Sequence, residues 1–302
     1  MSPFAAGLRW VEVPDPPPAD PIPLLILYPS NATVQTETLG PYPLSAARNA
    51  PVAGGTFPLV VISHGTGGSP LVYRTLAAHL ARNGFVVLLP EHPRNNRNNN
   101  ELAGTAAILT NRPRHLRRIV DWALLDDALG AALQPGAFSI VGHSLGGYTA
   151  LAVAGGLPTA FPHETPDHVS RPIEVAPDPR VSALVLLAPA APWFMAPGAL
   201  NAVRVPILML TAEKDPHTPP EHGQIIRRGL PEQTPLEYRV VPNAGHFSFL
   251  SPFPQTMTSP SFPPSQDPEG FHREPFHQHL NAEVLAFLNR VARAPGPAAA
   301  ST

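Results

Sequence analysis

The run Gly142-His143-Ser144-Leu145-Gly146 constrains the fold of this chain more than any other stretch of its sequence. It contains the pattern Gly-x-Ser-x-Gly between an apolar, β-type run at 137–141 and a small-residue helical run at 148–154. Strand, tight turn and helix are the context in which this pattern forms a sharp elbow that exposes the serine hydroxyl. Side chains two positions before and after Ser144 would collide with the neighbouring strand and helix, which explains both glycines. The sequence therefore predicts that Ser144 is a nucleophile.

Apolar runs of strand length alternate with helical patterns through the middle of the chain. The expected strands are 57–63, 85–89, 138–141, 181–187, 205–210 and 236–241, and the expected helices are 70–82, 113–129, the run after the elbow and 271–290. This alternation predicts an α/β fold with a mostly parallel central sheet and helices on both faces. Two weaker runs, 8–13 and 22–27, predict an antiparallel N-terminal edge.

We expect a single domain over residues 1–302. Residues 1–54 hold the edge strands and loops, residues 55–292 hold the core, and residues 293–302 form a frayed tail rich in alanine and proline. The 42 prolines cluster in stretches that we expect to be irregular surface loops, because proline lacks a backbone donor.

The composition excludes several classes of function. The formal net charge is −2, so nothing attracts nucleic acid electrostatically. The absence of cysteine excludes a thiol nucleophile and a thiolate metal site. Histidines and acidic residues do not occur at a spacing typical of metal ligands, so we expect no metal and no cofactor. No signal peptide or membrane span is recognisable, so we expect a cytoplasmic protein whose partner is a small-molecule substrate. The oligomeric state stays open.

A serine on such an elbow needs an acid and a base, which follow it in that order along the chain. The strand at 205–210 leads to Asp215, and the strand at 236–241 leads to His246. Parallel strands bring their carboxyl ends to one edge of the sheet, where ligands bind. We expect His246 to take the proton from Ser144 Oγ while the carboxylate of Asp215 holds the required tautomer.

Other acidic residues and histidines compete for these roles. Glu213 is the first rival for the acid, because a shift of its loop would present it instead, and Asp178 is a more distant rival. His217 and His222 share the loop of Asp215 and cannot easily face it across the site. Three histidines of the last expected helix are predicted to be solvated or to pack: His272, His277 and His279.

The glycine-rich run His64-Gly65-Thr66-Gly67-Gly68 follows the strand at 57–63. Glycines let backbone N–H groups approach a substrate oxygen, so we expect the N–H groups of Thr66 and Leu145 to form an oxyanion hole. A phosphate-binding loop is the alternative, but the run contains no Gly-x-Gly-x-x-Gly and no Lys-Ser/Thr pair follows it.

These motifs together resemble the α/β-hydrolase superfamily. The resemblance rests on the run from His64 to Gly68, the elbow at Ser144, the loop of Asp215 and the run Asn243-Ala244-Gly245-His246. It covers residues 55–292 and implies an α/β-hydrolase fold. It also implies a serine carboxylic-ester hydrolase in which Ser144, Asp215 and His246 form the triad.

Further stretches resemble the bacterial group described as predicted dienelactone hydrolases, which is related to platelet-activating-factor acetylhydrolases and cutinase-like polyesterases. They are residues 62–65, 76–80, 84–87, 90–93 and 267–271. True dienelactone hydrolases use a cysteine nucleophile. Because this chain has no cysteine, the resemblance implies the ester chemistry of the group and not that activity.

The substrate is less constrained. The apolar cluster Trp193, Phe194 and Met195 predicts either an acyl or alcohol pocket or the packing of a cap onto the core. Three segments are candidates to cover or border the site: 155–179, 190–200 and 250–268. Three further residues adjoin the expected catalytic groups and are expected to contact substrate: Gly65, His143 and Phe247.

The leading prediction is hydrolysis of short- or medium-chain carboxylic esters through an acyl-enzyme intermediate. Cleavage of amides or carbamates, or acyl transfer, would use the same residues. A binding protein without catalytic activity is the alternative of a different class.

Overall fold

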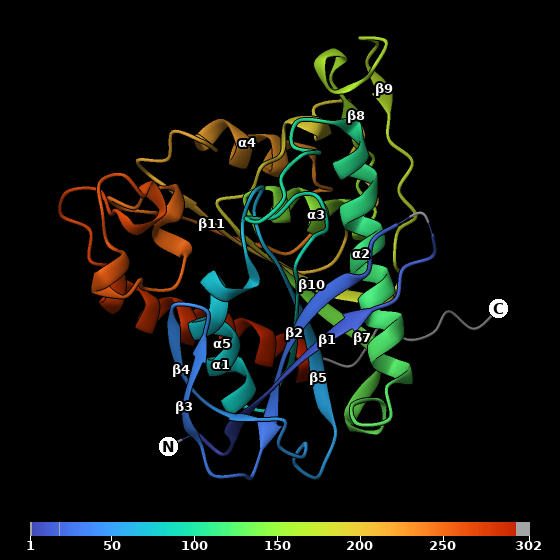
Figure 1. Cartoon of the computed structure of the whole chain (residues 1–302). Helices are drawn as coiled ribbons and strands as arrows, with labels where there is room; N and C mark the ends of the chain where they lie inside the picture. Colours follow the sequence, from blue (N-terminus) through green and yellow to red (C-terminus); the bar gives the residue numbers. More distant parts are fainter. Residues whose placement is uncertain (1, 18, 294–302) are drawn as a thin grey trace.

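The computed structural model describes residues 2–17 and 19–293, and within them one large sheet carries the fold (Figure 1). Its strands are β1 (Ala5–Val13), β2 (Ile22–Ser30), β3 (Gln35–Leu39), β4 (Tyr42–Arg48), β5 (Phe57–Ser63), β6 (Val86–Pro90), β7 (Leu133–His143), β10 (Val181–Leu187), β11 (Ile207–Ala212) and β12 (Leu236–Val241). The spatial order is β12-β11-β10-β7-β5-β6-β2-β1-β4-β3. Neighbours from β12 to β6 pair in parallel, whereas β2 pairs antiparallel with both β6 and β1. The expected mostly parallel sheet with an antiparallel N-terminal edge is therefore present.

The N-terminal edge is larger than the sequence predicted. β3 and β4 form an antiparallel pair that continues the sheet beyond β1. The prediction missed them because β3 is mostly exposed and polar, so it lacks the apolar run that marks a buried strand. A second small sheet, β8 (Thr159–Ala160) with β9 (Arg171–Pro172), lies in the segment after the elbow helix.

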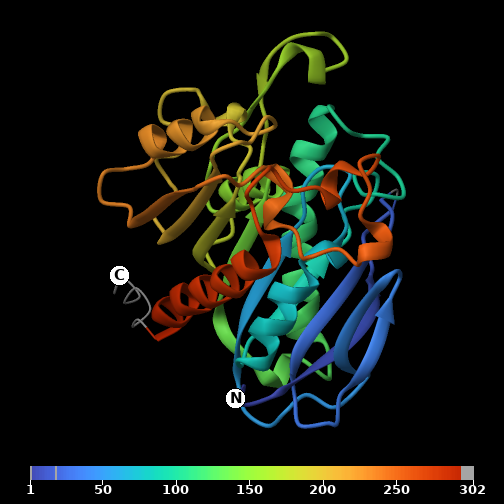
Figure 2. The same cartoon turned by 90° about the vertical axis from the view of Figure 1, so that its left-hand side faces the viewer.

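The helices cover both faces of the sheet, and the sheet separates the apolar core into two clusters. Alternation along β5 shows the division, because Val61 belongs to one cluster and Val60 and Ile62 belong to the other. Helices α2 (Ala106–Leu125) and α3 (Leu145–Val153) pack in the first cluster. Helices α1 (Arg74–Arg82) and α5 (Arg273–Arg293) pack side by side in the second, as Figure 2 shows.

Helix α2 corrects one prediction. It begins at Ala106 and ends at Leu125, whereas the expected helix ran from Pro113 to Leu129. Pro113 instead lies inside the helix, where its missing N–H leaves the carbonyl of Leu109 without its usual donor. The hydroxyl of Tyr148 on α3 donates to that carbonyl at 2.9 Å. The proline therefore creates the acceptor by which α2 holds the elbow helix.

Two further differences concern the later part of the chain. Helix α4 (Pro220–Gly229) was not predicted, because only Gly223 and Ile226 of its ten residues are buried. The expected frayed tail was 293–302, but Arg293 still belongs to α5. The rest of that tail lies outside the described residues. Among the described residues, no helix combines the length and the apolar character needed to cross a membrane.

Candidate active site

The turn between β7 and α3 holds Ser144 in a conformation that few non-glycine residues adopt, with φ 55° and ψ −121°. Both flanking glycines are required by contacts with backbone. A Cβ on Gly142 would lie 2.2 Å from the carbonyl oxygen of Gly146, and a Cβ on Gly146 would lie 2.0 Å from that of Ser63. The crowding predicted from the sequence is therefore present on both sides of the serine.

Three of the expected residues meet at the carboxyl ends of the parallel strands. Ser144 follows β7, Asp215 follows β11 and His246 follows β12. The Nδ1 of His246 donates to Oδ2 of Asp215 at 2.7 Å, and both side chains are buried. Ser144 and His246 line the same cavity.

The sequence did not reveal Thr218, which completes the surroundings of Asp215. Its Oγ1 lies 2.7 Å from Oδ2 of Asp215 and 3.2 Å from Nδ1 of His246. The backbone N–H groups of His217 and Thr218 also donate to Oδ1 of Asp215, at 2.7 and 2.9 Å. Asp-x-x-Thr is a common pattern for an aspartate that caps its own turn, and it was the available signal.

The charge state of Asp215 follows from these contacts. Burial by itself raises the pKa of this carboxyl, but the hydrogen bonds from His246 and Thr218 outweigh burial and hold the pKa below its ordinary value. An ionised Asp215 keeps the proton of His246 on Nδ1. The Nε2 of the imidazole is then free to accept a proton.

The rival acids have other partners. The carboxylate of Glu213 accepts the backbone N–H of Asn243 at 2.7 Å at an exposed position, and Asp178 pairs with Arg180 at 2.6 Å. Of these candidates, Asp215 is the one in contact with His246.

Three of the competing histidines lie in two kinds of surroundings. His217 and His222 line the cavity, and the ring centre of His217 lies 4.9 Å from that of His246. The imidazole that hydrogen-bonds to Asp215 is that of His246. His277 is buried with Nε2 3.0 Å from the carbonyl of Ser248, which is a packing role as predicted. No group of three or more acidic or histidine side chains in the described part of the chain is placed to hold a metal ion.

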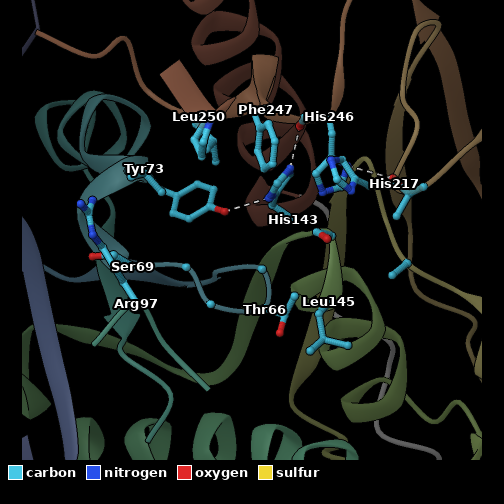
Figure 3. A pocket seen from close by; sticks show the side chains of 18 of the residues that line it. Thr66, Ser69, Tyr73, Arg97, His143, Leu145, His217, His246, Phe247 and Leu250 are labelled. Atoms are coloured by element: carbon cyan, nitrogen blue, oxygen red, sulfur yellow. Dashed lines mark hydrogen bonds between the residues drawn. The ribbon is translucent and has the colours of Figure 1, made fainter. Parts of the chain in front are cut away.

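His143 joins the elbow to the loop of His246 (Figure 3). Its Nε2 lies 3.0 Å from the carbonyl oxygen of His246, and this oxygen can only accept, so Nε2 carries the proton. Its Nδ1 must then accept from the hydroxyl of Tyr73, 2.9 Å away. Burial lowers the pKa of His143 to about 3, so the ring is neutral near pH 7. The sequence missed Tyr73, because only the fold brings it to the elbow.

The glycine-rich loop after β5 places Thr66 beside the elbow. The N–H of Gly68 donates to the carbonyl of Gly65 at 3.1 Å and closes a tight turn around Thr66. A Cβ on Gly65 would lie 3.1 Å from the Cβ of Ser144, so the glycine permits this close approach. Leu145 is the first residue of α3, and its N–H therefore has no partner within the helix. Backbone donors at Thr66 and Leu145 can bind a negatively charged oxygen next to Ser144.

The cavity above Ser144 has a volume of about 610 Å³ and a mainly apolar wall. All three segments expected to border the site reach it: 155–179 contributes Glu164, 190–200 contributes Trp193, and 250–268 contributes Phe253 and Phe262 among others. Four of the residues expected to contact substrate line it: Gly65, His143, Trp193 and Phe247. Arg97 also lines it, as does Ile108 of α2, which was not predicted.

Phe194 and Met195 correct the prediction for the apolar cluster, because neither belongs to the lining of this cavity. Phe194 is buried and stacks on Tyr148 with ring centres 5.5 Å apart, whereas Met195 is 59% exposed to solvent. Trp193 combines both roles, because its ring packs on Tyr148 and also lines the cavity. Both alternatives left open by the sequence are thus realised, each by a different residue.

Comparisons with known proteins agree with this architecture. A family model described as Chlorophyllase matches residues 27–163, a span that contains the glycine-rich loop and the elbow but ends before Asp215 and His246. The solved structure of a ferulic acid esterase from Streptomyces cinnamoneus superposes with a TM-score of 0.67 at 20% identity, covering 100% of this chain and 94% of that chain. No curated protein matches the sequence. At this identity, the likeness shows that the two chains share a fold.

Proposed function

We propose that this chain, which has the α/β-hydrolase fold, is a serine hydrolase of carboxylic esters. The observation that carries the proposal is the hydrogen-bonded pair of Asp215 and His246, buried at the strand ends next to the strained turn of Ser144. The name of the similar solved structure, an esterase, supports ester bonds as the target.

The proposed reaction has two halves. Ser144 Oγ attacks the ester carbonyl carbon while Nε2 of His246 takes the hydroxyl proton, and the ionised Asp215 stabilises the imidazolium. The carbonyl oxygen becomes an oxyanion held by the N–H groups of Thr66 and Leu145. Collapse of this intermediate breaks the ester bond, His246 returns the proton to the leaving alcohol, and the acyl group stays on Ser144. Water then repeats the sequence and releases the acid.

The cavity supports apolar substrates of modest size. Its volume of about 610 Å³ falls within the range of sites that enclose small ligands, and its wall is mainly hydrophobic and aromatic. Acyl or alcohol groups of short or medium length would bury apolar area against Trp193, Leu250 and Phe253. We therefore propose short- and medium-chain esters as the substrate class, cleaved through the acyl-enzyme.

The test is an activity profile of the purified protein on p-nitrophenyl esters of increasing acyl length, with matched anilides and carbamates beside them. We expect ester hydrolysis with an optimum at short or medium chains. Ser144→Ala should lower kcat by on the order of 10⁶, as loss of the nucleophile does in other serine hydrolases. The control, Ser261→Ala at an exposed serine, should keep full activity. Activity that survives Ser144→Ala, or anilides cleaved as fast as esters, would overturn the proposal.

A further inference from the structure

Arg112 of α2 is a completely buried cation whose hydrogen-bond partners are all neutral oxygens. Its Nε donates to Thr149 Oγ1 at 3.2 Å, one terminal nitrogen donates to Asn95 Oδ1, and the other donates to the carbonyl of His64. In the part of the chain that the structure describes, no carboxylate forms an ion pair with it.

This guanidinium stays charged at neutral pH. Burial lowers the pKa of Arg112 to about 9, which is still well above 7. Burying a cation without a counter-ion opposes folding, and an apolar side chain of similar volume is often as stable or more so in such a place. The stability of the fold therefore does not account for an arginine at this position.

The partners of Arg112 lead to both residues that carry the proposed oxyanion donors. On one side, His64 lies two residues before Thr66, and Asn95 Nδ2 donates to Thr66 Oγ1 at 2.9 Å. On the other side, Thr149 Oγ1 donates to the carbonyl of Leu145 at 2.9 Å, one turn earlier in α3. One guanidinium thus holds the loop and the elbow helix together.

The two segments also meet directly at this place. A Cβ on Gly146 would lie 2.0 Å from the carbonyl oxygen of Ser63 and 3.2 Å from that of His64, so the helix packs on the loop backbone with no side chain between them. The hydrogen bond from Tyr148 to Leu109 attaches the same helix to α2 one turn before Arg112. α2 is therefore the element against which both halves of the hole are fixed.

We propose, resting on the proposed function, that Arg112 is a positioning residue of the oxyanion hole. It sets the distance between the backbone N–H groups of Thr66 and Leu145 and places a permanent positive charge behind them. Such fixed charge stabilises the oxyanion that develops in the transition state more than it stabilises the neutral ester. Arg112 itself does not touch the substrate.

The experiment compares Arg112→Met and Arg112→Lys with Arg118→Met, a matched control that removes one arginine from a half-exposed position of the same helix. Arg112→Met should lower kcat on a p-nitrophenyl ester by on the order of 10²-fold, the size of the loss of one oxyanion donor, with KM changed less than about threefold. Arg112→Lys keeps the charge without the fork of donors and should recover part of kcat. Arg118→Met should match the unmodified protein.

A second readout separates positioning from general stability. A trifluoromethyl ketone adds to Ser144 and places an oxyanion in the hole, whereas the matched unfluorinated ketone reports ground-state binding. The Ki of the fluorinated ketone should rise in proportion to the loss of kcat/KM, and that of the plain ketone should stay within about threefold. Asn95→Ala and Thr149→Val cut the two branches singly and should each lower kcat by about tenfold while Arg112 remains.

The outcomes are distinct. If the unmodified protein hydrolyses esters and a folded Arg112→Met, counted by its reaction with a fluorophosphonate, keeps kcat within threefold, the role of Arg112 is refuted. If Arg112→Met does not fold, unchanged kcat in both Asn95→Ala and Thr149→Val refutes it equally. A lack of ester hydrolysis in the unmodified protein, or its survival in Ser144→Ala, would instead refute the proposed function.

Discussion

The cavity has a floor made by the ends of four parallel strands, and three irregular segments form much of its walls. The floor residues lie in the loops and turns that follow β5, β7, β11 and β12, and hydrogen bonds fix them. The walls come from 155–179, 190–200 and 250–268, which contain only short turns and a two-residue strand pair. Aromatic contacts hold them, such as Trp193 on Tyr148 at 4.9 Å and Phe253 on Phe262 at 5.3 Å between ring centres.

This difference separates the residues expected to carry the chemistry from those expected to select the substrate. On the proposed function, the floor determines which bond is attacked, and it depends on atoms placed by the sheet and by backbone contacts that tolerate no added side chain. The walls determine which molecule fits, and they depend on apolar surfaces that can exchange one residue for another at modest cost. Changes in the floor should therefore reduce kcat strongly, whereas changes in the walls should alter the choice of substrate.

After the nucleophile itself, the largest effect is expected for the acid of the floor. Asp215→Asn should lower kcat by about 10⁴, because the amide favours the wrong tautomer of His246. Glu213→Gln is the matched control, since that carboxylate lies at the exposed backbone N–H of Asn243, and should change kcat less than twofold. Steady-state kinetics on a p-nitrophenyl ester measures both. A larger loss of kcat in Glu213→Gln than in Asp215→Asn would identify Glu213 as the acid.

The next effect concerns pH, because the floor rests on neutral histidines. Burial lowers the pKa of His64, His115 and His143 to about 3 and that of His92 well below its ordinary value of 6.5. Between pH 6.5 and about 3 the unfolded chain binds protons that the folded chain does not, so stability falls as pH falls. Each such histidine should contribute roughly 1.4 kcal/mol per pH unit in this window.

Urea unfolding at several pH values checks this expectation. His115→Gln should reduce the slope of unfolding free energy against pH by about one proton. His163→Gln, at an exposed position in the walls, should leave that slope unchanged. Equal slopes in the two variants would show that the buried histidines are not the source of acid sensitivity.

A smaller effect is expected where the floor is attached to α2. Tyr148→Phe should destabilise the protein by about 1–3 kcal/mol, since the buried carbonyl of Leu109 loses its donor. In a Pro113→Ala background the backbone N–H of residue 113 can serve that carbonyl, so the same change should cost less. Thermal unfolding of the four proteins in this double-mutant cycle measures the coupling. Strict additivity of the two changes would show that the Tyr148 hydroxyl does not replace the N–H that Pro113 lacks.

The smallest effect is expected in the walls. Trp193→Ala should raise KM about tenfold on medium-chain esters, as the loss of apolar contact area predicts, with kcat little changed. Met195→Ala, two residues away but exposed, should change neither constant by more than twofold. Equal effects of the two variants would mean that Trp193 does not contact bound substrate.

The same contrast explains what could be predicted from the sequence. The sheet, the elbow and the residues after β11 and β12 were predictable, because each is encoded by a run of apolar residues next to a glycine or a polar residue. Tyr73 and Arg112 were not, since their importance arises from segments that only the fold brings together. Thr218 lies three residues after Asp215, so the local pattern offered a signal for its contact with that carboxylate. Trp193, Phe194 and Met195 share one pattern, and their different surroundings depend on how a short helical turn rotates over Tyr148.

The strand order has a consequence for how activity returns after unfolding. β5 pairs in parallel with β7, although α1, β6 and α2 intervene along the chain, and β11 and β12 join last in sequence. Parallel pairing over such separations is slow, because chain entropy is lost before the contacts form. We therefore expect the strand ends to come together at a late stage of folding. Recovery of ester hydrolysis in a refolding experiment should lag behind the recovery of helical circular dichroism. The return of activity would then report when the sheet is complete.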